Sequence, residues 1–150
     1  MKFLSFRRGF TLIEILIVVA IIGILASVAL VGLNPVQKKG RDARRISDIR
    51  QIQTALELYF TKNGGYPQIS CYSGSGCLQD VITGADIGVR TLPDDPRANS
   101  GVHYLYGSDG STYVLGAQLE EVTNTVLNDS LKSDSYGFNC GQAGVYCVSI

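Results

Sequence analysis

The sequence predicts an α+β protein in which one long N-terminal helix packs against a small antiparallel β-sheet. Three observations support this prediction. Residues 10–33 are almost uniformly apolar, residues 34–62 repeat apolar side chains with a helical period, and residues 63–150 combine strand-like segments with turn residues and four cysteines. The hydrophobic fraction of 45% is too high for a disordered chain of zero formal net charge.

The first of these segments, residues 10–33, has one ionisable side chain, Glu14. As a helix the segment extends about 36 Å, more than the roughly 30 Å hydrocarbon core of a bilayer. We therefore expect a single membrane-spanning helix. A secretory signal peptide cleaved near residues 27–29 is the alternative, but the apolar run is long for such a peptide and continues beyond that site.

A short basic leader, residues 1–9, precedes the apolar segment and ends in Gly9. The segment then begins with the sequence FTLIE, which places its acidic side chain at Glu14. This arrangement resembles the N-terminus of type IV pilins and of type II secretion pseudopilins. In that family a membrane peptidase cuts after the glycine, and the new N-terminal residue is methylated. The resemblance therefore implies cleavage between Gly9 and Phe10 and a mature chain of residues 10–150.

Glu14 needs an explanation, because a carboxylate in the bilayer centre costs about 3 kcal/mol on insertion scales. In one interpretation Glu14 lies close enough to the new chain end at Phe10 to reach the membrane interface. The resemblance implies another: Glu14 pairs with the Phe10 amine of a neighbouring subunit when a filament assembles. We favour this pairing, which would also penalise wrong registers, since an unpaired buried charge is costly.

Residues 34–62 are expected to form an amphipathic helix that packs on the head. The apolar side chains that define its stripe are Ala43, Ile46, Ile49, Ile52, Leu56 and Tyr59 or Phe60. Asn34-Pro35 is expected to interrupt the helix, and Asn63-Gly64-Gly65 to end it. The basic cluster in residues 38–50 is interpreted as a solvated face or an anchor to anionic lipid, with contact to the acidic heads of adjacent subunits as a further option. Nucleic-acid binding is not expected, because no aromatic residues alternate with the cations.

The head, residues 63–150, carries four cysteines whose spacing matches no CxxC metal or redox motif. They are Cys71, Cys77, Cys140 and Cys147. Disulfides are expected, and they imply an oxidising compartment outside the cytoplasm. The pairs Cys71–Cys77 and Cys140–Cys147 are preferred over two crossed pairings, which stay open. The positive-inside rule points to a cytoplasmic head, because more cations follow the apolar segment than precede it, but the leader and the cysteines outweigh it.

Strand signals in the head predict a three-stranded antiparallel sheet. Residues 102–106 and 112–115 are rich in β-branched and aromatic side chains, and they flank the turn sequence Ser108-Asp109-Gly110-Ser111. An Asp-Gly turn between two such segments is typical of a β-hairpin. Residues 145–148 form the third expected strand, and the apolar stripe of the helix is expected to cover one face of the sheet.

The head offers few candidates for catalysis or metal binding. The single histidine, His103, is expected within the sheet without a chemical partner, and the sequence PDDP at residues 93–96 in a turn. No nucleophile–base pair, phosphate loop or metal-ligand cluster is evident, so we expect neither an enzyme nor a cofactor. Some pseudopilins hold calcium near the end of the sheet, and by residue type alone the candidates here are Asp109, Asp129 and Asp134.

The resemblance implies a structural protein. It would be stored in the cytoplasmic membrane as a single-pass protein with its head outside the cytoplasm, cleaved by a prepilin peptidase, and assembled into a homo-oligomeric helical filament by pilus or secretion machinery. We expect an extracellular type IV pilus-like filament, because four cysteines suit an exposed fibre. The alternatives are a pseudopilin of a type II secretion system, which suits the short head, and a membrane-tethered monomeric binding module.

Overall fold

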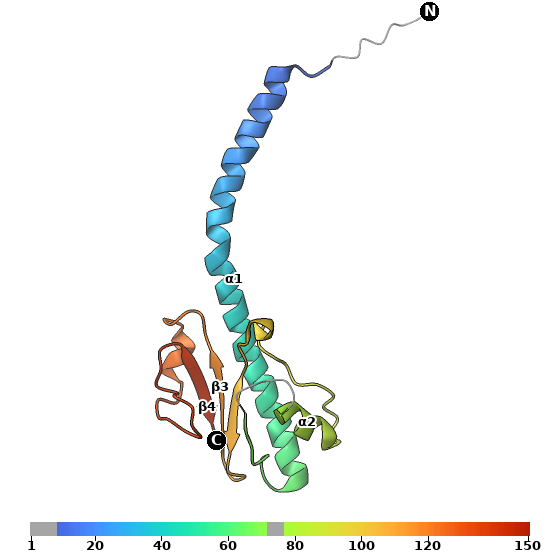
Figure 1. Cartoon of the computed structure of the whole chain (residues 1–150), viewed down its shortest axis with the longest axis vertical. Coiled ribbons are helices and arrows are strands. Elements are labelled where there is room, and N and C mark those ends of the chain that lie inside the picture. Colours follow the sequence, from blue (N-terminus) through green and yellow to red (C-terminus); the bar gives the residue numbers. More distant parts are fainter. Residues whose placement is uncertain (1–8, 72–76) are drawn as a thin grey trace, which may run out of the picture. The chain divides into compact units, whose positions relative to one another are not determined.

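The computed structural model describes residues 9–71 and 77–150, except for the side chains of residues 28–33 and 70–71. The chain divides into two compact units, Met1–Gln37 and Lys38–Ile150. The expected α+β class is confirmed, with one long helix followed by a small antiparallel sheet (Figure 1).

Helix α1 spans Leu12–Asn63 and contains Pro35. The expected interruption at Asn34-Pro35 is therefore wrong. A proline removes one backbone hydrogen bond from the helix, and the bonds on either side of it continue the helical ladder. The expected end is confirmed, because Gly64 adopts a left-handed conformation with φ of 75° and its N–H donates to the carbonyl of Phe60 at 2.8 Å.

In the unit Met1–Gln37, the described apolar side chains of α1 face solvent. Phe10, which precedes the helix, is exposed as well. The large apolar side chains of this part of α1 that are at least half exposed are Leu12, Ile13, Ile15, Leu16, Ile17, Val18, Val19, Ile21, Ile22, Ile24, Leu25 and Val36. Among the residues that the structure describes, no helix combines the length and the hydropathy needed to cross a membrane. The side chains of residues 28–33 lie outside the described set, and the assignment of residues 10–33 as an assembly segment stays a prediction.

The unit Lys38–Ile150 contains a four-stranded antiparallel sheet in the order β1-β2-β3-β4. The strands are β1 Ser70–Cys71, β2 Leu105–Ser108, β3 Tyr113–Gln118 and β4 Val145–Ser149. The expected hairpin is confirmed: Ser108 of β2 lies opposite Tyr113 of β3, and the Asp109 carboxylate accepts hydrogen bonds from the backbone N–H groups of Ser111 and Thr112. The third expected strand is β4, and β1 is a short additional edge strand.

The inner face of the sheet packs against the second half of α1. Ile49, Ile52 and Leu56 of the helix are buried in one core with Tyr113 and Leu115 of β3. The predicted stripe is thus confirmed over these three residues and Tyr59, which packs against the same core. It is wrong at Ala43, which is exposed because Asp42 and Arg45 occupy the buried face there. Helix α2, Cys77–Gly84, and the short 3-10 helix η1, Ala98–Ser100, lie between β1 and β2 in the chain. Neither was predicted from the sequence.

The 3-10 helix η2, Thr125–Asn128, follows β3 in the chain, and its Leu127 belongs to the inner core. The outer face of the sheet is covered by residues 131–140, which we call the outer cover. Phe138 of this segment is buried against Val114 and Val145 of the sheet. A Cβ atom at Gly107 would lie 2.5 Å from the Cβ of Tyr136, so only glycine permits this close approach.

The disulfide expected between Cys140 and Cys147 is present and joins this covering segment to β4. The side chain of Cys71 lies outside the described set, so its expected bond with Cys77 stays a prediction.

Candidate assembly site and its ion-pair network

The two residues expected to flank the cleavage site, Gly9 and Phe10, precede α1 and are exposed. The side chain of Phe10 is 84% exposed, and a Cβ atom at Gly9 would meet nothing within 4 Å. The cleavage and methylation themselves stay predictions.

Glu14 is held in place by Thr11. Its Oε2 accepts hydrogen bonds from the backbone N–H of Thr11 at 2.9 Å and from the Thr11 hydroxyl at 2.8 Å. In return, the backbone N–H of Glu14 donates to Thr11 Oγ1 at 3.3 Å. This reciprocal pattern is a capping box, which satisfies the free donors at a helix N-terminus. Thr11 was missed in the sequence analysis, although the T-x-x-E spacing before an apolar run is the signal that identifies it.

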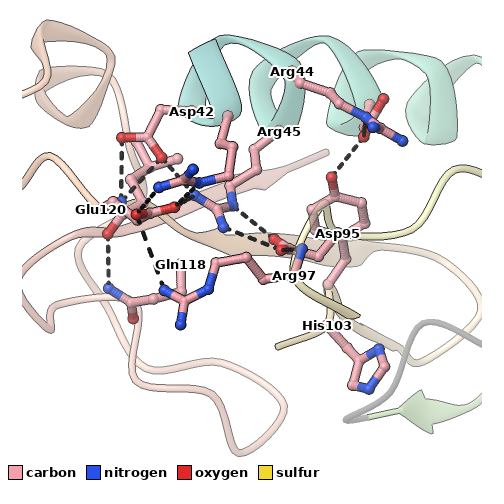
Figure 2. Close-up of polar contacts among 12 residues, drawn as sticks. Asp42, Arg44, Arg45, Asp95, Arg97, His103, Gln118 and Glu120 are labelled. Carbon is pink, nitrogen blue, oxygen red and sulfur yellow. Dashed lines mark hydrogen bonds and ion pairs between the residues drawn. The ribbon is translucent and has the colours of Figure 1, made fainter. Parts of the chain in front are cut away.

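A buried ion-pair network, centred on Arg45, joins the second half of α1 to the loops of the head (Figure 2). Arg45 is 1% exposed, and its Nε and Nη2 donate to the two carboxylate oxygens of Asp95 at 2.7 and 3.1 Å. Its Nη1 donates to Asp42 at 2.7 Å and to Glu120 at 3.0 Å. Burying a charge is costly unless it is paired on every side, and the guanidinium meets that condition.

Asp42 and Glu120 extend the network to the segment that follows β3. Asp42 is fully buried, and its carboxylate accepts hydrogen bonds from the backbone N–H groups of Glu120 at 3.0 Å and Glu121 at 2.9 Å. Glu120 in turn binds Arg41 through two hydrogen bonds of 2.6 and 2.7 Å. These hydrogen bonds from Arg41, with a smaller contribution from Arg45, lower the pKa of Glu120 to about 2. The segment that directly follows β3 is therefore fixed to α1 by charged groups.

The basic cluster at residues 38–50 is only partly the solvated face that we expected. Arg41 and Arg45 are at least partly buried in ion pairs with Glu120 and Asp95. The other cations of the cluster are exposed, namely Lys38, Lys39, Arg44 and Arg50, although Lys39 lies 3.7 Å from Glu121 and Arg44 lies 3.6 Å from Asp48. The burial of Asp42 and Arg45 was missed because charged side chains are usually counted as solvent-facing. Their spacing was a usable signal: residues 42, 45, 49, 52 and 56 recur every three or four positions and share one face of α1.

His103 is not the isolated strand residue that we expected. It precedes β2, and its Nδ1 lies 3.3 Å from Oδ1 of Asp94, so this expectation is wrong. The turn expected at residues 93–96 is supported by side-chain bonds to the backbone: Asp94 accepts from the N–H of Asp95, and Asp95 accepts from the N–H of Arg97. The carboxylate of Asp95 is also the main partner of Arg45, a role that the turn signal alone did not reveal.

Within the described ranges, no group of three or more His, Cys, Asp or Glu side chains is arranged to hold a metal ion. The calcium candidates Asp109, Asp129 and Asp134 therefore do not form such a group. Asp109 instead stabilises the turn of the hairpin through its hydrogen bonds to Ser111 and Thr112.

The fold and the N-terminal motif define the class of this protein. A sequence model for the prokaryotic N-terminal methylation motif matches residues 4–30, which include Gly9, Phe10 and Glu14. A long N-terminal helix that packs on a small antiparallel sheet completes the pattern of a pilin-like subunit.

Full-length relatives identify the family within this class. The chain is 32% identical to the type II secretion system core protein G of Escherichia coli K12, in an alignment that covers 74% of this chain and 81% of that protein. The proteins of the same name from Vibrio cholerae and Pseudomonas aeruginosa are 31% and 37% identical, over 81% and 77% of this chain and 88% and 87% of their own lengths. The chain belongs to the family of the type II secretion system core protein G. No solved structure matches the chain significantly.

These relatives support the pseudopilin alternative better than the type IV pilus that we expected first. The four cysteines had favoured a surface fibre. Disulfides require only an oxidising compartment, however, so they do not separate the two kinds of filament.

Proposed function

We propose that this chain is a pseudopilin, a filament subunit of a type II secretion system that is stored in the cytoplasmic membrane with its head outside the cytoplasm. The observation that carries the proposal is the N-terminal half of α1, whose described apolar side chains are at least half exposed behind the single acid Glu14. An apolar surface of this extent needs either lipid or the apolar helices of other subunits around it. The family named by the relatives supports the second environment as the end state.

In this proposal a prepilin peptidase cuts between Gly9 and Phe10, and the new N-terminal residue is methylated. The backbone N–H and hydroxyl of Thr11 lie beyond that cut, so the capping box with Glu14 survives it. Thr11 thereby gives the carboxylate a partner while the subunit is in the membrane. On assembly, Glu14 pairs with the Phe10 amine of a neighbouring subunit, and the pairing of two buried charges selects the correct register.

The head has a structural role in this proposal, and no catalytic step is assigned to it. The Arg45 network fixes its loops to α1, and the Cys140–Cys147 disulfide fixes the outer cover to β4. Secretion assembly proteins extract the subunit from the membrane, and the heads form the surface of the filament.

The test is complementation in the native host after deletion of the gene for this chain. In the deletion strain, proteins that are normally secreted are expected to accumulate inside the cell envelope. Expression of the wild-type chain is expected to restore both secretion and the filaments that can be sheared from the cells. Glu14→Ala is expected to restore neither, while Asp80→Asn, which changes an exposed head carboxylate, restores both. If Glu14→Ala works as well as wild type, the chain is a tethered monomer instead. If surface fibres are lost while secretion is intact, it is a type IV pilin.

A further inference from the structure

A cavity of about 330 Å³ opens on the outer face of the sheet, beside the outer cover, and the proposed function makes no use of it. Its floor is apolar, because it includes Leu105 of β2, Phe138 of the outer cover and Val145 of β4, which pack together on that face. Four residues with polar side chains also line it, namely His103, Gln118, Asn139 and Gln142. Ligand pockets in proteins combine these features, and their volumes begin at about 300 Å³. We call this cavity the His103 pocket.

The amide side chains of the His103 pocket are available to a ligand. Asn139 and Gln142 are exposed, and the hydrogen bonds that the described structure shows for them are made by backbone groups. Gln118 is exposed as well, and its Nε2 donates to the carbonyl of Leu119 at 3.2 Å, which leaves its amide oxygen as an acceptor. A side-chain amide carries both donors and acceptors, so these residues offer both kinds of group to a ligand.

His103 adds an oriented imidazole to the lining. Its side chain is 20% exposed, and its Nδ1 lies 3.3 Å from Oδ1 of Asp94. The ring points away from the Arg45 network (Figure 2). Because a hydrogen bond at one ring nitrogen fixes the role of the other, Asp94 orients the ring and leaves Nε2 for a ligand.

The lining of the His103 pocket favours a neutral ligand. None of the described residues that line it is Asp, Glu, Lys or Arg. The charge that His103 carries when it is protonated is balanced by Asp94. A charged ligand would lose its hydration here without gaining an opposite charge, which is costly.

The wall that the outer cover contributes is held in place before a ligand binds. Tyr136 and Gly137 form a tight turn, with φ of 51° and 82°, and the hydroxyl of Tyr136 lies 2.8 Å from Oγ1 of Thr112. The Cys140–Cys147 disulfide fixes the other end of this wall to β4. A preformed wall lowers the cost of ordering side chains and loops on binding.

We infer that the His103 pocket binds a neutral ligand rich in hydroxyl groups, of the size of one sugar unit. A hydroxyl both donates and accepts, so it matches amide and imidazole groups in either direction. A sugar ring carries hydroxyls around its edge, which suits polar groups that come from separate elements: His103 before β2, Gln118 in β3 and Asn139 in the outer cover. The C–H groups of the ring suit the apolar floor. This inference goes beyond the proposed function and does not depend on filament assembly.

An NMR titration of the full-length chain tests the binding, in dodecylphosphocholine, a detergent without a sugar head group. His103 is the single histidine of the sequence, so in a chain without a histidine tag its ring signals identify themselves. The probes are the methyl glycosides of glucose, galactose, mannose and N-acetylglucosamine, and glycerol is the control for hydroxyl groups without a ring. At least one glycoside is expected to shift the ring signals saturably, with a dissociation constant of about 1–10 mM. Glycerol is expected to give no saturable shift.

Variants of the exposed amides locate the site. Asn139→Ala with Gln142→Ala removes two hydrogen-bonding groups from the pocket and keeps His103 as the reporter. The dissociation constant of the glycoside is expected to rise about tenfold or more in this variant. Gln51→Ala with Asn128→Ala is the matched control, since it removes one exposed glutamine and one exposed asparagine from α1 and η2. The control is expected to bind the glycoside as wild type does.

Three results would overturn the inference. The first is the absence of a saturable shift with every glycoside up to about 100 mM, tenfold above the weakest expected dissociation constant. The second is an unchanged affinity in the Asn139 and Gln142 variant, which would place the bound sugar elsewhere. The third is a saturable shift with N-acetylvaline methylamide and with none of the glycosides, which would assign the pocket to a peptide. Filament formation is not a readout of this experiment, so the proposed function is tested separately.

Discussion

The two halves of α1 invert the usual relation between polarity and burial. In residues 12–27 the apolar side chains are exposed, and the one acid, Glu14, has its partner three residues away. In residues 41–56 the charged Asp42 and Arg45 are buried with the apolar side chains, and their partners lie far along the sequence. One helix thus carries a half that packs on its own head and a half whose described apolar side chains are exposed, which in the proposed function lipid or other subunits surround.

This difference indicates how the two halves are specified. Buried charges tolerate few alternative arrangements, so the Arg45 network fixes the register in which the head loops meet α1. Apolar side chains tolerate many arrangements, which suits the proposed function, in which this surface is surrounded first by lipid and then by other helices. In the proposed assembly, Glu14 distinguishes registers, because it is the ionisable side chain of residues 10–33. Variants in each half therefore test the comparison directly.

The largest effect is expected from Arg45→Met. Methionine fills much of the space of the arginine stem but leaves the carboxylates of Asp42 and Asp95 buried without their guanidinium partner. We expect a loss of about 3–5 kcal/mol in the free energy of unfolding. Denaturant unfolding of the full chain in detergent, followed by circular dichroism, measures it.

Arg44→Met is the matched control, because Arg44 is adjacent, 61% exposed and paired with Asp48 at 3.6 Å. We expect it to cost less than about 1 kcal/mol. Equal losses in the free energy of unfolding for Arg44→Met and Arg45→Met would show that a buried ion pair of this network stabilises the fold no more than an exposed one.

The next effect concerns the outer cover. Replacing both Cys140 and Cys147 by serine removes a bond across a sequence separation of 7 residues, and the chain-entropy model predicts a loss of about 2–2.5 kcal/mol. Hydrogen exchange is expected to rise in residues 130–142 and to stay low in residues 45–56, because the inner core does not depend on the disulfide. Faster exchange in both segments would mean that the two faces of the sheet unfold together.

A smaller effect is expected from the titration of Glu120. Its pKa in the folded chain is about 2, below the ordinary value of 4.5, because of the hydrogen bonds from Arg41 and Arg45. A lowered carboxyl pKa stabilises the fold above the ordinary value, and this stabilisation is lost as the pH falls through the folded pKa. Between pH 4.5 and 2 we expect about 1–2 kcal/mol of stability to be lost through this group.

Glu120→Gln tests this assignment, since it keeps the size of the side chain and removes the titration. The variant is expected to be less stable than wild type at pH 7 and to lose less stability on acidification. If the acid dependence of the two chains is the same, the titrating group lies elsewhere.

The smallest effect is expected in the first half of α1. Thr11→Val keeps the shape of the side chain and removes the hydroxyl that bonds Glu14 Oε2 at 2.8 Å, while the backbone N–H remains. Loss of the cap is expected to weaken the helix N-terminus by about 1 kcal/mol, and Thr11→Ser to restore it. Amide exchange at residues 12–15 in detergent measures the change. Equal exchange in both variants would show that the hydroxyl has no part in the cap.

Local periodicity explains what the sequence revealed of the fold. Two elements depend only on residues that are close together in the sequence, and both are present in the structure. They are the apolar stripe of Ile49, Ile52 and Leu56 and the hairpin around Asp109. The break expected at Pro35 was wrong because one missing donor does not outweigh the hydrogen bonds around it.

The network escaped the sequence analysis for a different reason. Whether Arg45 is buried depends on Asp95 and Glu120, which lie 50 and 75 residues away, and no local pattern encodes that proximity. For the assembly site, the motif around Gly9, Phe10 and Glu14 was evident from sequence, while the partner Thr11 emerged only from its hydrogen bonds.

The central claim is that this chain is a processed subunit that polymerises through its N-terminal helix. The most direct test is the intact mass of the chain recovered from filaments sheared from its native host. Residues 10–150 plus one methyl group are predicted, because cleavage after Gly9 must precede assembly. An uncut chain beginning at Met1, or a chain beginning near residue 30, would contradict the account.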